Sequence, residues 1–359
     1  RTPAFQAGYV GSIPITRFIQ KDVYARVAQG WSTTLPRLGS RVRIPSRALF
    51  ITEISSQKFR FFVFPKTFLP KKGILMIQDI APHKYYVDYQ PSVPNDTDLV
   101  LIYGHHTILC NFEDPEIRYP SIAEIAAVFP EIKEKAKFLF RIDETDYYEL
   151  RSPQLPEFGI WKYENTLILR SAVPGWLGFA GITGYQIHTW YTDHTYCGRC
   201  GTKMHAPGNE RAMQCPSCGA LSYPVICPSV IVAITDGDRL LLTKYAPSHS
   251  SHRQYALVAG YTEVGETLEQ TVHREVMEEV GLKVKNLRYY KSQPWSFSGS
   301  LLAGFYCDVD GDPSITLDRE ELSVAEWFDR DSLPETPNLI SLTGEMIECF
   351  RQGKEPKQN

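Results

Sequence analysis

The chain has 359 residues, of which 43% are hydrophobic and 22% charged, with a net charge of −3. This composition is ordinary for a soluble globular protein, and the length is sufficient for two or three domains with their own cores. No run of 18 or more apolar residues occurs, which argues against a membrane-spanning helix.

The first 75 residues are strongly basic, with 13 Lys and Arg against only Asp22 and Glu53. Such a segment can be a nucleic-acid arm or an organelle transit peptide. However, the first methionine is Met76, and residues 42–45 read Val-Arg-Ile-Pro, which the common T-arm sequence of a transfer-RNA gene encodes in one frame. We therefore interpret residues 1–75 as translated upstream DNA or a dispensable native extension, and infer no function from them.

Residues 76–185 are rich in strand signals and predict an N-terminal domain. Residues 99–103 and 107–110 are apolar and flank a short polar turn, a pattern typical of a hairpin. Ser121 can cap a helix over residues 122–128 before Pro130 ends it.

Residues 186–225 contain two C-x-x-C pairs, Cys197/Cys200 and Cys215/Cys218, separated by fourteen residues. This spacing predicts a four-cysteine zinc ribbon whose single structural Zn²⁺ has no open coordination position. The alternatives are a redox dithiol or a ribbon that reads nucleic acid. Since four thiolates complete the shell, we expect His205, between the pairs, on the surface. The other cysteines are scattered among apolar neighbours, and this usage favours a reducing cytoplasm.

Residues 226–352 are expected to form a third domain. Residues 229–235 and 239–243 are apolar and flank an Asp-Gly-Asp turn, which indicates a buried hairpin. Further strands are expected at 255–258, 287–292, 301–309 and 326–328, and a last helix at 341–351.

Between them lies a helix with an unusual concentration of glutamates. Residues 266–280 contain no proline or glycine, and Val272, Val276 and Val280 recur every fourth residue with Met277 beside them, so this side is expected to face the core. Glu275, Glu278 and Glu279 fall on a neighbouring face, where like charges repel. Water, protonation or a bound divalent cation can relieve such repulsion.

The spacing from Gly260 through Glu266, Arg274-Glu275-Val276 and Glu278-Glu279 to Gly281-Leu282 resembles the Nudix box at every defined position. The resemblance implies an α+β fold, a Nudix α/β/α sandwich with a mixed sheet, and metal-dependent cleavage of a nucleoside diphosphate linked to another group. The implied metal is Mg²⁺ or Mn²⁺, which neutralises the pyrophosphate and lowers the pKa of a bound water.

Carried over residue by residue, the resemblance makes Glu275, Glu278 and Glu279 metal ligands and catalytic residues, with Glu279 also the base or orienter of the attacking water. Glu266 is implied to support the loop and to reach the metal through water. Arg274 is implied to hold the carboxylates by an ion pair.

Residues 292–300 read Ser-Gln-Pro-Trp-Ser-Phe-Ser-Gly-Ser and resemble the S-Q-P-W-P-F-P-x-S motif of the NADH pyrophosphatase branch of Nudix hydrolases. That branch also carries a zinc ribbon ahead of its catalytic domain. Ser296 and Ser298 replace two prolines of the motif, which should make the loop less rigid. Trp295 and Phe297 suit a ligand with flat rings, although such residues can instead fill a core. The implied substrate-binding residues here are Ser292, Gln293, Pro294, Trp295, Ser296, Phe297, Ser298, Gly299 and Ser300.

Local alignment with the family extends the expected site. Tyr223 and Tyr261 resemble aromatic residues that flank the nicotinamide or adenine ring, and Glu210 resembles a substrate contact near the ribbon. Glu321 resembles a further metal-binding glutamate, with Glu320 as the competing choice. Ala259 is implied to offer its carbonyl to the metal.

These resemblances imply that the protein hydrolyses NADH, and less selectively NAD⁺, into nicotinamide mononucleotide and AMP. They also imply a homodimer in which aromatic residues of one subunit complete the site of the other, and the cysteine usage favours a cytoplasmic location. Removal of the NAD cap from RNA is the alternative main role. A zinc-ribbon binding module with an inert Nudix domain is the alternative of a different class.

Overall fold

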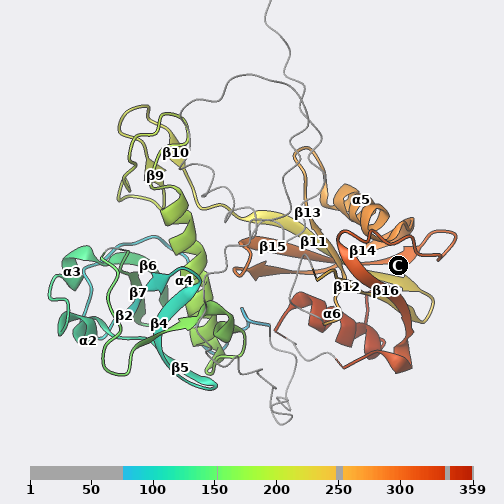
Figure 1. The fold of residues 1–359 in the computed structure, drawn as a ribbon, viewed down its shortest axis with the longest axis horizontal. Helices are drawn as coiled ribbons and strands as arrows, with labels where there is room; N and C mark the ends of the chain where they lie inside the picture. The colour runs from blue at the N-terminus through green and yellow to red at the C-terminus, as the bar shows by residue number, and fades with distance from the viewer. Residues whose placement is uncertain (1–75, 152, 248–253, 336–339, 358–359) are drawn as a thin grey trace, which may run out of the picture.

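The computed structural model describes residues 76–151, 153–247, 254–335 and 340–357. The chain forms an N-terminal domain with two small sheets, a cysteine-rich unit, and a C-terminal domain with one large sheet between two helices (Figure 1). The basic segment 1–75 lies outside the described residues. Within the described ranges, no helix has the length and apolar character needed to cross a membrane.

The N-terminal domain is rich in short strands, as expected. Its elements are β1 (Tyr85–Tyr86), β2 (Leu99–Leu101), β3 (Tyr103–Gly104), β4 (Thr107–Glu113), β5 (Glu116–Arg118), α2 (Ile122–Ala126), α3 (Ile132–Lys135), β6 (Lys137–Ile142), β7 (Thr145–Glu149), β8 (Lys162–Asn165) and the 3-10 helix η1 (Thr166–Arg170). One sheet has the order β1-β6-β7-β2, and the other has the order β3-β4-β5 with β8 paired to β4.

The predicted hairpin is confirmed for β3 and β4, where Tyr103 pairs with Ile108. The expected first strand is divided, however, because β2 leaves the hairpin and pairs with β7 in parallel. Helix α2 begins after Ser121 as predicted. The Ser121 hydroxyl accepts a hydrogen bond from the Glu124 N–H, and the Glu124 carboxylate accepts one from the Ser121 N–H.

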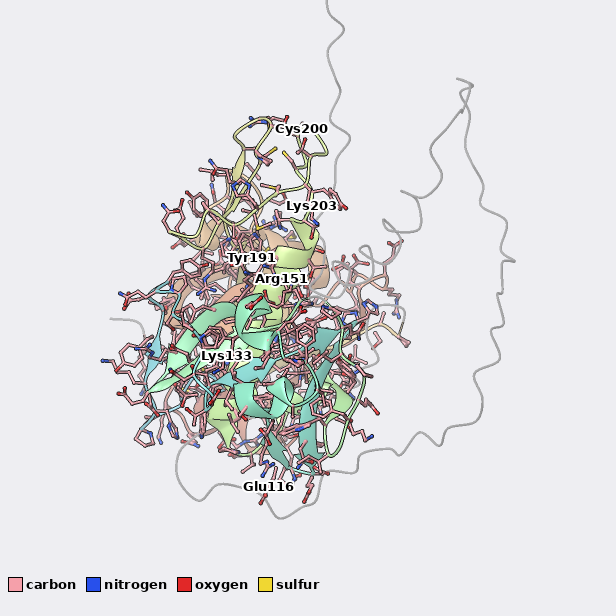
Figure 2. The ribbon with its side chains drawn as sticks, turned by 90° about the vertical axis from the view of Figure 1, so that its left-hand side faces the viewer. Glu116, Lys133, Arg151, Tyr191, Cys200 and Lys203 are labelled. Atoms are coloured by element: carbon pink, nitrogen blue, oxygen red, sulfur yellow. The ribbon has the colours of Figure 1, made fainter. Side chains whose placement is uncertain are left out.

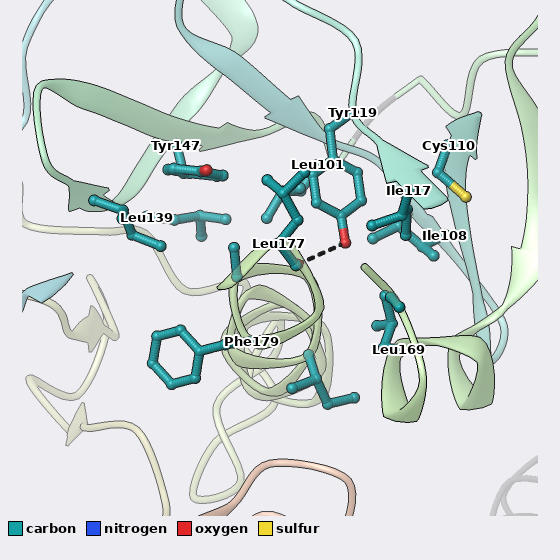
Figure 3. Close-up of a cluster of buried hydrophobic side chains, with 14 of the residues drawn as sticks. Leu101, Ile108, Cys110, Ile117, Tyr119, Leu139, Tyr147, Leu169, Leu177 and Phe179 are labelled. Atoms are coloured by element: carbon teal, nitrogen blue, oxygen red, sulfur yellow. Dashed lines mark hydrogen bonds between the residues drawn. The ribbon is translucent and has the colours of Figure 1, made fainter. Parts of the chain in front are cut away.

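Helix α4 (Gly175–Asp193) joins the N-terminal domain to the cysteine-rich unit. Its first turns enter the domain core, where the Tyr119 hydroxyl donates a hydrogen bond to the Leu177 carbonyl at 3.0 Å (Figure 3). Its last turns bury Trp190 and Tyr191 in the core of the cysteine-rich unit. The expected domain boundary between residues 185 and 186 therefore falls inside a continuous helix.

The cysteine-rich unit sits at the far end of α4 and contains the two-stranded sheet of β9 (Met213–Gln214) and β10 (Leu221–Ser222). Figure 2 shows Cys200 at the tip of this unit, with Tyr191 and Arg151 at its base. The Arg151 guanidinium lies 4.2 Å from the centre of the Tyr191 ring, so the junction is packed rather than open.

The C-terminal domain is a mixed sheet covered on both faces. Its elements are β11 (Cys227–Asp236), β12 (Arg239–Tyr245), β13 (Val258–Tyr261), α5 (Leu268–Val280), β14 (Val284–Trp295), β15 (Ser300–Val309), β16 (Leu322–Asp329), the 3-10 helix η2 (Arg330–Ser332) and α6 (Leu342–Arg351). The strand order is β14-β15-β11-β12-β16, with β13 paired to β11. Strands β11 and β15 are parallel and the other pairs are antiparallel, which makes the sheet mixed.

Helices α5 and α6 lie on opposite faces of this sheet (Figure 1). Because side chains alternate along a strand, Val230 and Val232 of β11 join the α5 cluster, whereas Ile231 and Ala233 join the α6 cluster. The sandwich and the hairpin of β11 and β12 confirm the expected fold. The strand expected at 255–258 begins only at Val258.

The N-terminal and C-terminal domains share contacts. Ile77 and Phe297 each pack against both the core around α4 and the core beneath α6. The Ile77 N–H also donates a hydrogen bond to the Ile340 carbonyl at 3.2 Å. The start of the described chain is thus held between the two domains.

Candidate active site

Helix α5 is fixed at both ends. At its start, the Thr267 hydroxyl accepts a hydrogen bond from the Gln270 N–H, and the Gln270 side chain accepts one from the Thr267 N–H. At its end, Gly281 has a φ of 70°, the left-handed conformation typical of glycine after a helix. The predicted core side is confirmed by three fully buried valines, Val272, Val276 and Val280.

The remaining sides of α5 differ in exposure. Met277, which we expected beside the valines, is 43% exposed, because it lies about 100° around the helix from Val276. The side chain of Glu278 is also 43% exposed. Glu275 and Glu279 are each only 2% exposed. Two of the three carboxylates of the helix are therefore buried.

Gly260 leaves the space that Glu275 occupies. A Cβ at residue 260 would overlap the Cδ and both carboxylate oxygens of Glu275. Strand β13 can approach α5 this closely only because residue 260 has no side chain. The glycine of the box thus determines where a buried carboxylate lies.

Arg274 joins the carboxylates into one network. Its Nε and Nη2 atoms donate to the two oxygens of Glu266 at 2.6 and 2.7 Å, a bidentate ion pair. Its Nη1 atom donates to Glu275 Oε1 at 2.7 Å and to Glu278 Oε2 at 3.1 Å. Its Nη2 atom also donates to the Tyr261 carbonyl at 2.9 Å. The ion pairing expected of Arg274 is confirmed.

The three environments change the carboxyl pKa values in different directions. Hydrogen bonds from Arg274 lower the pKa of Glu266 to about 2. Burial raises the pKa of Glu275 to about 7 despite the nearby Arg274. Burial, followed by the charges of Glu275 and Glu321, raises the pKa of Glu279 well above its ordinary value. The buried pair therefore lacks enough positive charge from the protein to remain ionised easily.

The donor atoms around Glu279 are chemically suited to a divalent cation, but among the described residues only the four paired cysteines bring three or more such atoms within 4.8 Å of one another. The Oε2 atom of Glu279 is buried and has no hydrogen-bond partner among the described residues. The surrounding groups are carboxylate oxygens, which Mg²⁺ and Mn²⁺ prefer. A cation would supply the charge that Glu275 and Glu279 lack. Glu278, in contrast, is engaged by Arg274.

Other elements contribute groups around Glu279. A backbone hydrogen bond from Ala259 offsets a small part of the rise in the pKa of Glu279, which burial causes. Glu321 is half-buried and acts electrostatically on both Glu275 and Glu279, whereas Glu320 is exposed. The structure thus favours Glu321 over Glu320 as the additional carboxylate of the site.

Residues 292–300 comprise the end of β14 and the turn into β15, so the expected loop is partly a strand. Within this loop, Gln293 is completely buried. Its Nε2 atom donates to Gln78 Oε1 at 3.0 Å and to the Ile340 carbonyl at 2.9 Å, and its Oε1 atom accepts from the Leu342 N–H at 2.6 Å. Its amide is therefore occupied by protein partners at the start of α6. Neighbouring Ser292 and Pro294 are exposed.

The aromatic residues of this loop face the N-terminal domain. Trp295 is 8% exposed, and Phe297 is half-buried with its ring centre 4.9 Å from that of Trp295. The Arg170 guanidinium lies 5.2 Å from the Trp295 ring centre and 4.8 Å from that of Phe297. Contact with Arg170 anchors the loop to η1.

Hydroxyl groups connect this loop to β13. Ser298 Oγ and Ser300 Oγ are 2.7 Å apart, and Ser300 Oγ donates to the Tyr261 hydroxyl at 3.3 Å. Ser298, which replaces a proline of the motif, therefore contributes a hydrogen bond. Ser296 and Gly299 are half-buried beside them.

Tyr223 and Glu210 lie together near the ribbon. The Tyr223 hydroxyl donates to Glu210 Oε1 at 3.4 Å, while the Tyr223 side chain remains 51% exposed. Tyr223 belongs to an exposed apolar strip between the ribbon and the C-terminal domain, formed by Leu221, Tyr223, Val225 and Ile226.

The four paired cysteines converge as predicted. All four Sγ atoms lie within 4.8 Å of one another, and Cys200 Sγ lies 3.5 Å from Cys215 Sγ and 3.6 Å from Cys218 Sγ. Sulfur atoms around a tetrahedral Zn²⁺ are about 3.8 Å apart, so the arrangement fits zinc. Hydrogen bonds with Thr202 lower the pKa of Cys200 to about 6, which favours the ligating thiolate. His205 is exposed, as expected.

Sequence reasoning missed two residues at these sites. Arg170 lies far from the loop in sequence, and no local pattern identified its contact with Trp295. Tyr245 ends β12, and its ring packs in the α5 cluster. Its position among apolar strand residues gave no signal of a polar environment.

Comparison with known proteins agrees with this geometry. Residues 226–348 match the NUDIX domain, and residues 193–223 match the NADH pyrophosphatase zinc ribbon domain. The fold and site thus define a Nudix domain preceded by a zinc ribbon. The chain belongs to the Nudix hydrolase family, in the branch that carries the NADH pyrophosphatase zinc ribbon.

Two relatives are each named "NAD-capped RNA hydrolase NudC". The relative from Klebsiella pneumoniae (strain 342) is 47% identical over 178 residues, covering 49% of this chain and 66% of the relative. The relative from Erwinia tasmaniensis is 42% identical over 206 residues, covering 53% of this chain and 77% of the relative. The chain thus matches slightly less than two thirds of the Klebsiella relative's length.

A solved NUDIX hydrolase from Nitrosomonas europaea is 20% identical, with a TM-score of 0.39 over 44% of this chain and 91% of the other.

Proposed function

We propose that the protein is a metal-dependent hydrolase that splits the pyrophosphate bond of NADH, and less selectively NAD⁺, into nicotinamide mononucleotide and AMP. The observation that carries this proposal is the buried Oε2 of Glu279, which has no hydrogen-bond partner in the described part of the chain and lies one helical turn from Glu275. Two buried carboxylates with raised pKa values are poorly stabilised by the protein alone. In a hydrolase that binds divalent cations, these two carboxylates would have a function as ligands.

Glu275, Glu279 and Glu321 would hold Mg²⁺ or Mn²⁺, with the Ala259 backbone beside them and Glu278 completing the set after release from Arg274. The bound cation would neutralise the diphosphate and lower the pKa of a water molecule. Glu279 accepts the proton of the attacking water, whose oxygen bonds to phosphorus as the bridging oxygen leaves with the other phosphate. Arg274 keeps Glu275 in place through its 2.7 Å hydrogen bond.

The proposed substrate contacts divide into three groups. Tyr261 and the exposed Tyr223 offer faces to flat rings, and Glu210 orients Tyr223 through its hydrogen bond. Ser292, Ser296, Ser298 and Ser300 offer hydroxyls to ribose or phosphate oxygens. Pro294, Gly299 and Gln293 shape the loop, while Trp295 and Phe297 support it through their contact with Arg170.

Removal of the NAD cap from RNA is the second candidate, supported by the name of the two relatives. The cleaved bond is the same, but the substrate is larger. Competition kinetics between NADH, NAD⁺ and NAD-capped RNA distinguish these candidates by their kcat/KM values.

The proposal extends to a cytoplasmic homodimer. The exposed strip of Leu221, Tyr223, Val225 and Ile226 is an apolar surface suited to a second copy of the chain. None of the eight cysteines is in a disulfide, which suits a reducing compartment. The oligomeric state can be measured by sedimentation.

Product analysis of NADH with Mg²⁺ or Mn²⁺ tests the activity. We expect AMP from the wild-type chain and a rate at least about 100-fold lower from Glu279→Gln, which removes the charge and keeps the shape. Without any AMP from the wild-type chain, the protein would instead be a zinc-ribbon binding module with an inert Nudix domain.

A further inference from the structure

Tyr245 is placed beside the carboxylates by two strands. It ends β12 and pairs with Leu322 of β16, next to a register shift in the ladder. The following residue, Ala246, donates its N–H to the Glu321 carbonyl at 2.8 Å. The backbone at Tyr245 is therefore joined to the segment that carries Glu321.

The Tyr245 ring lies between the sheet and α5. It is half-buried and packs against the cluster that contains Val272 and Val276 of α5 together with Leu322. These valines share the helix with Glu275 and Glu279. The ring therefore lies on the α5 side of the sheet, together with the helix that carries Glu275 and Glu279.

The electrostatic environment of the phenol agrees with this placement. Burial raises the pKa of Tyr245, and the charges of Glu279, Glu275 and Glu321 raise it further. The phenol is thus within electrostatic range of three carboxylates, which accept hydrogen bonds when ionised and cannot then donate them.

We propose that Tyr245 is a further catalytic residue, whose phenol donates a hydrogen bond to a phosphate oxygen of the bound diphosphate. This inference rests on the proposed hydrolysis of a diphosphate. The three carboxylates can bind a cation, but they repel phosphate oxygens. A neutral donor from β12 can approach a phosphate oxygen without competing for the cation, and it stabilises negative charge there.

The hydroxyl can be removed without altering the packing of the ring. Tyr245→Phe is compared with the wild-type chain by isothermal titration calorimetry, first with Mn²⁺ alone and then with methylenediphosphonate at saturating Mn²⁺. We expect the Mn²⁺ affinity to stay within about twofold and the methylenediphosphonate affinity to fall about tenfold, as for a lost hydrogen bond to a charged oxygen. With NADH, kcat/KM should fall by at least as much.

Tyr289→Phe is the matched control. Tyr289 lies on β14, at the opposite edge of the sheet, and its side chain is 55% exposed. We expect both affinities to be unchanged in this variant.

Three results would overturn the proposal: an unchanged methylenediphosphonate affinity in Tyr245→Phe, a marked loss of Mn²⁺ affinity in that variant, or no binding of methylenediphosphonate by the wild-type chain. The second would show that the phenol supports the cation site instead. Failure to hydrolyse NADH would contradict the proposed function, while the two affinities still decide the role of Tyr245.

Discussion

The backbone of Gly260 lies directly against the carboxylate of Glu275, without room between them for one methyl group. In Gly260→Ala the carboxylate must move, and a displacement near 1 Å at a catalytic group costs about 100-fold in rate. We therefore expect hydrolysis to fall at least about 100-fold and the Mn²⁺ affinity to weaken. Steady-state kinetics and calorimetry measure both effects.

Gly175→Ala is the control for this change. Gly175 begins α4, and a Cβ there meets no atom within 4 Å. Full activity in a folded Gly260→Ala protein would contradict the proposed role of Glu275.

The raised pKa of Glu275 predicts a pH-dependent stability of the metal-free chain. Between its ordinary pKa of 4.5 and the folded value of about 7, the folded chain holds a proton that the unfolded chain has lost. The free energy of unfolding should therefore decrease as pH rises through this window. Glu275→Gln should reduce the decrease, and Mn²⁺ should offset it, because the cation binds the ionised carboxylate.

Urea unfolding at about pH 5 and about pH 7.5 checks this sign. If the free energy of unfolding changed equally with pH in the wild-type chain and in Glu275→Gln, the Glu275 carboxyl group would titrate normally in the folded protein.

The hydrogen bonds of Gln293 predict a structural effect for a residue of the substrate loop. Gln293→Leu removes three buried bonds and leaves Gln78 and the Leu342 N–H without this partner. We expect a loss of about 2 to 4 kcal/mol in the free energy of unfolding, measured with urea. Gln352→Leu, which removes an exposed amide, should cost far less. A raised KM with unchanged stability would instead indicate a direct substrate contact.

The convergence of the four cysteines predicts one Zn²⁺ per subunit. Cys200→Ser should lose most of the zinc, measured by mass spectrometry, and Trp190 fluorescence should change because its ring is buried in the ribbon core. Cys227→Ser, a change at a half-buried cysteine outside the cluster, should keep the metal. A zinc-free wild-type protein would exclude a zinc ribbon that is loaded when folded.

Much of the fold could be predicted because the signals are local. The spacing of Val272, Val276 and Val280 correctly indicated the buried side of α5, and the capping chemistry of Ser121 fixed the start of α2. The error at Met277 arose because a neighbour in sequence was treated as a neighbour on the helix face.

The details of the site depend on contacts between distant segments. Gly260 was identified by its place in the box, but the overlap it avoids became visible only when β13 was placed against α5. The burial of Gln293 depends on Gln78 and on the start of α6. Propensity and spacing along one segment do not determine such partners.

Ile77 packs against two cores at once. Because the unfolding of either domain would expose apolar surface of the other, the shared side chain couples the unfolding of the two domains. Calorimetry should therefore record one heat-absorption peak where two independent domains would give two. Ile77→Asp should move the unfolding of the two domains apart in temperature, because it leaves Phe297 as the other side chain that packs against both cores.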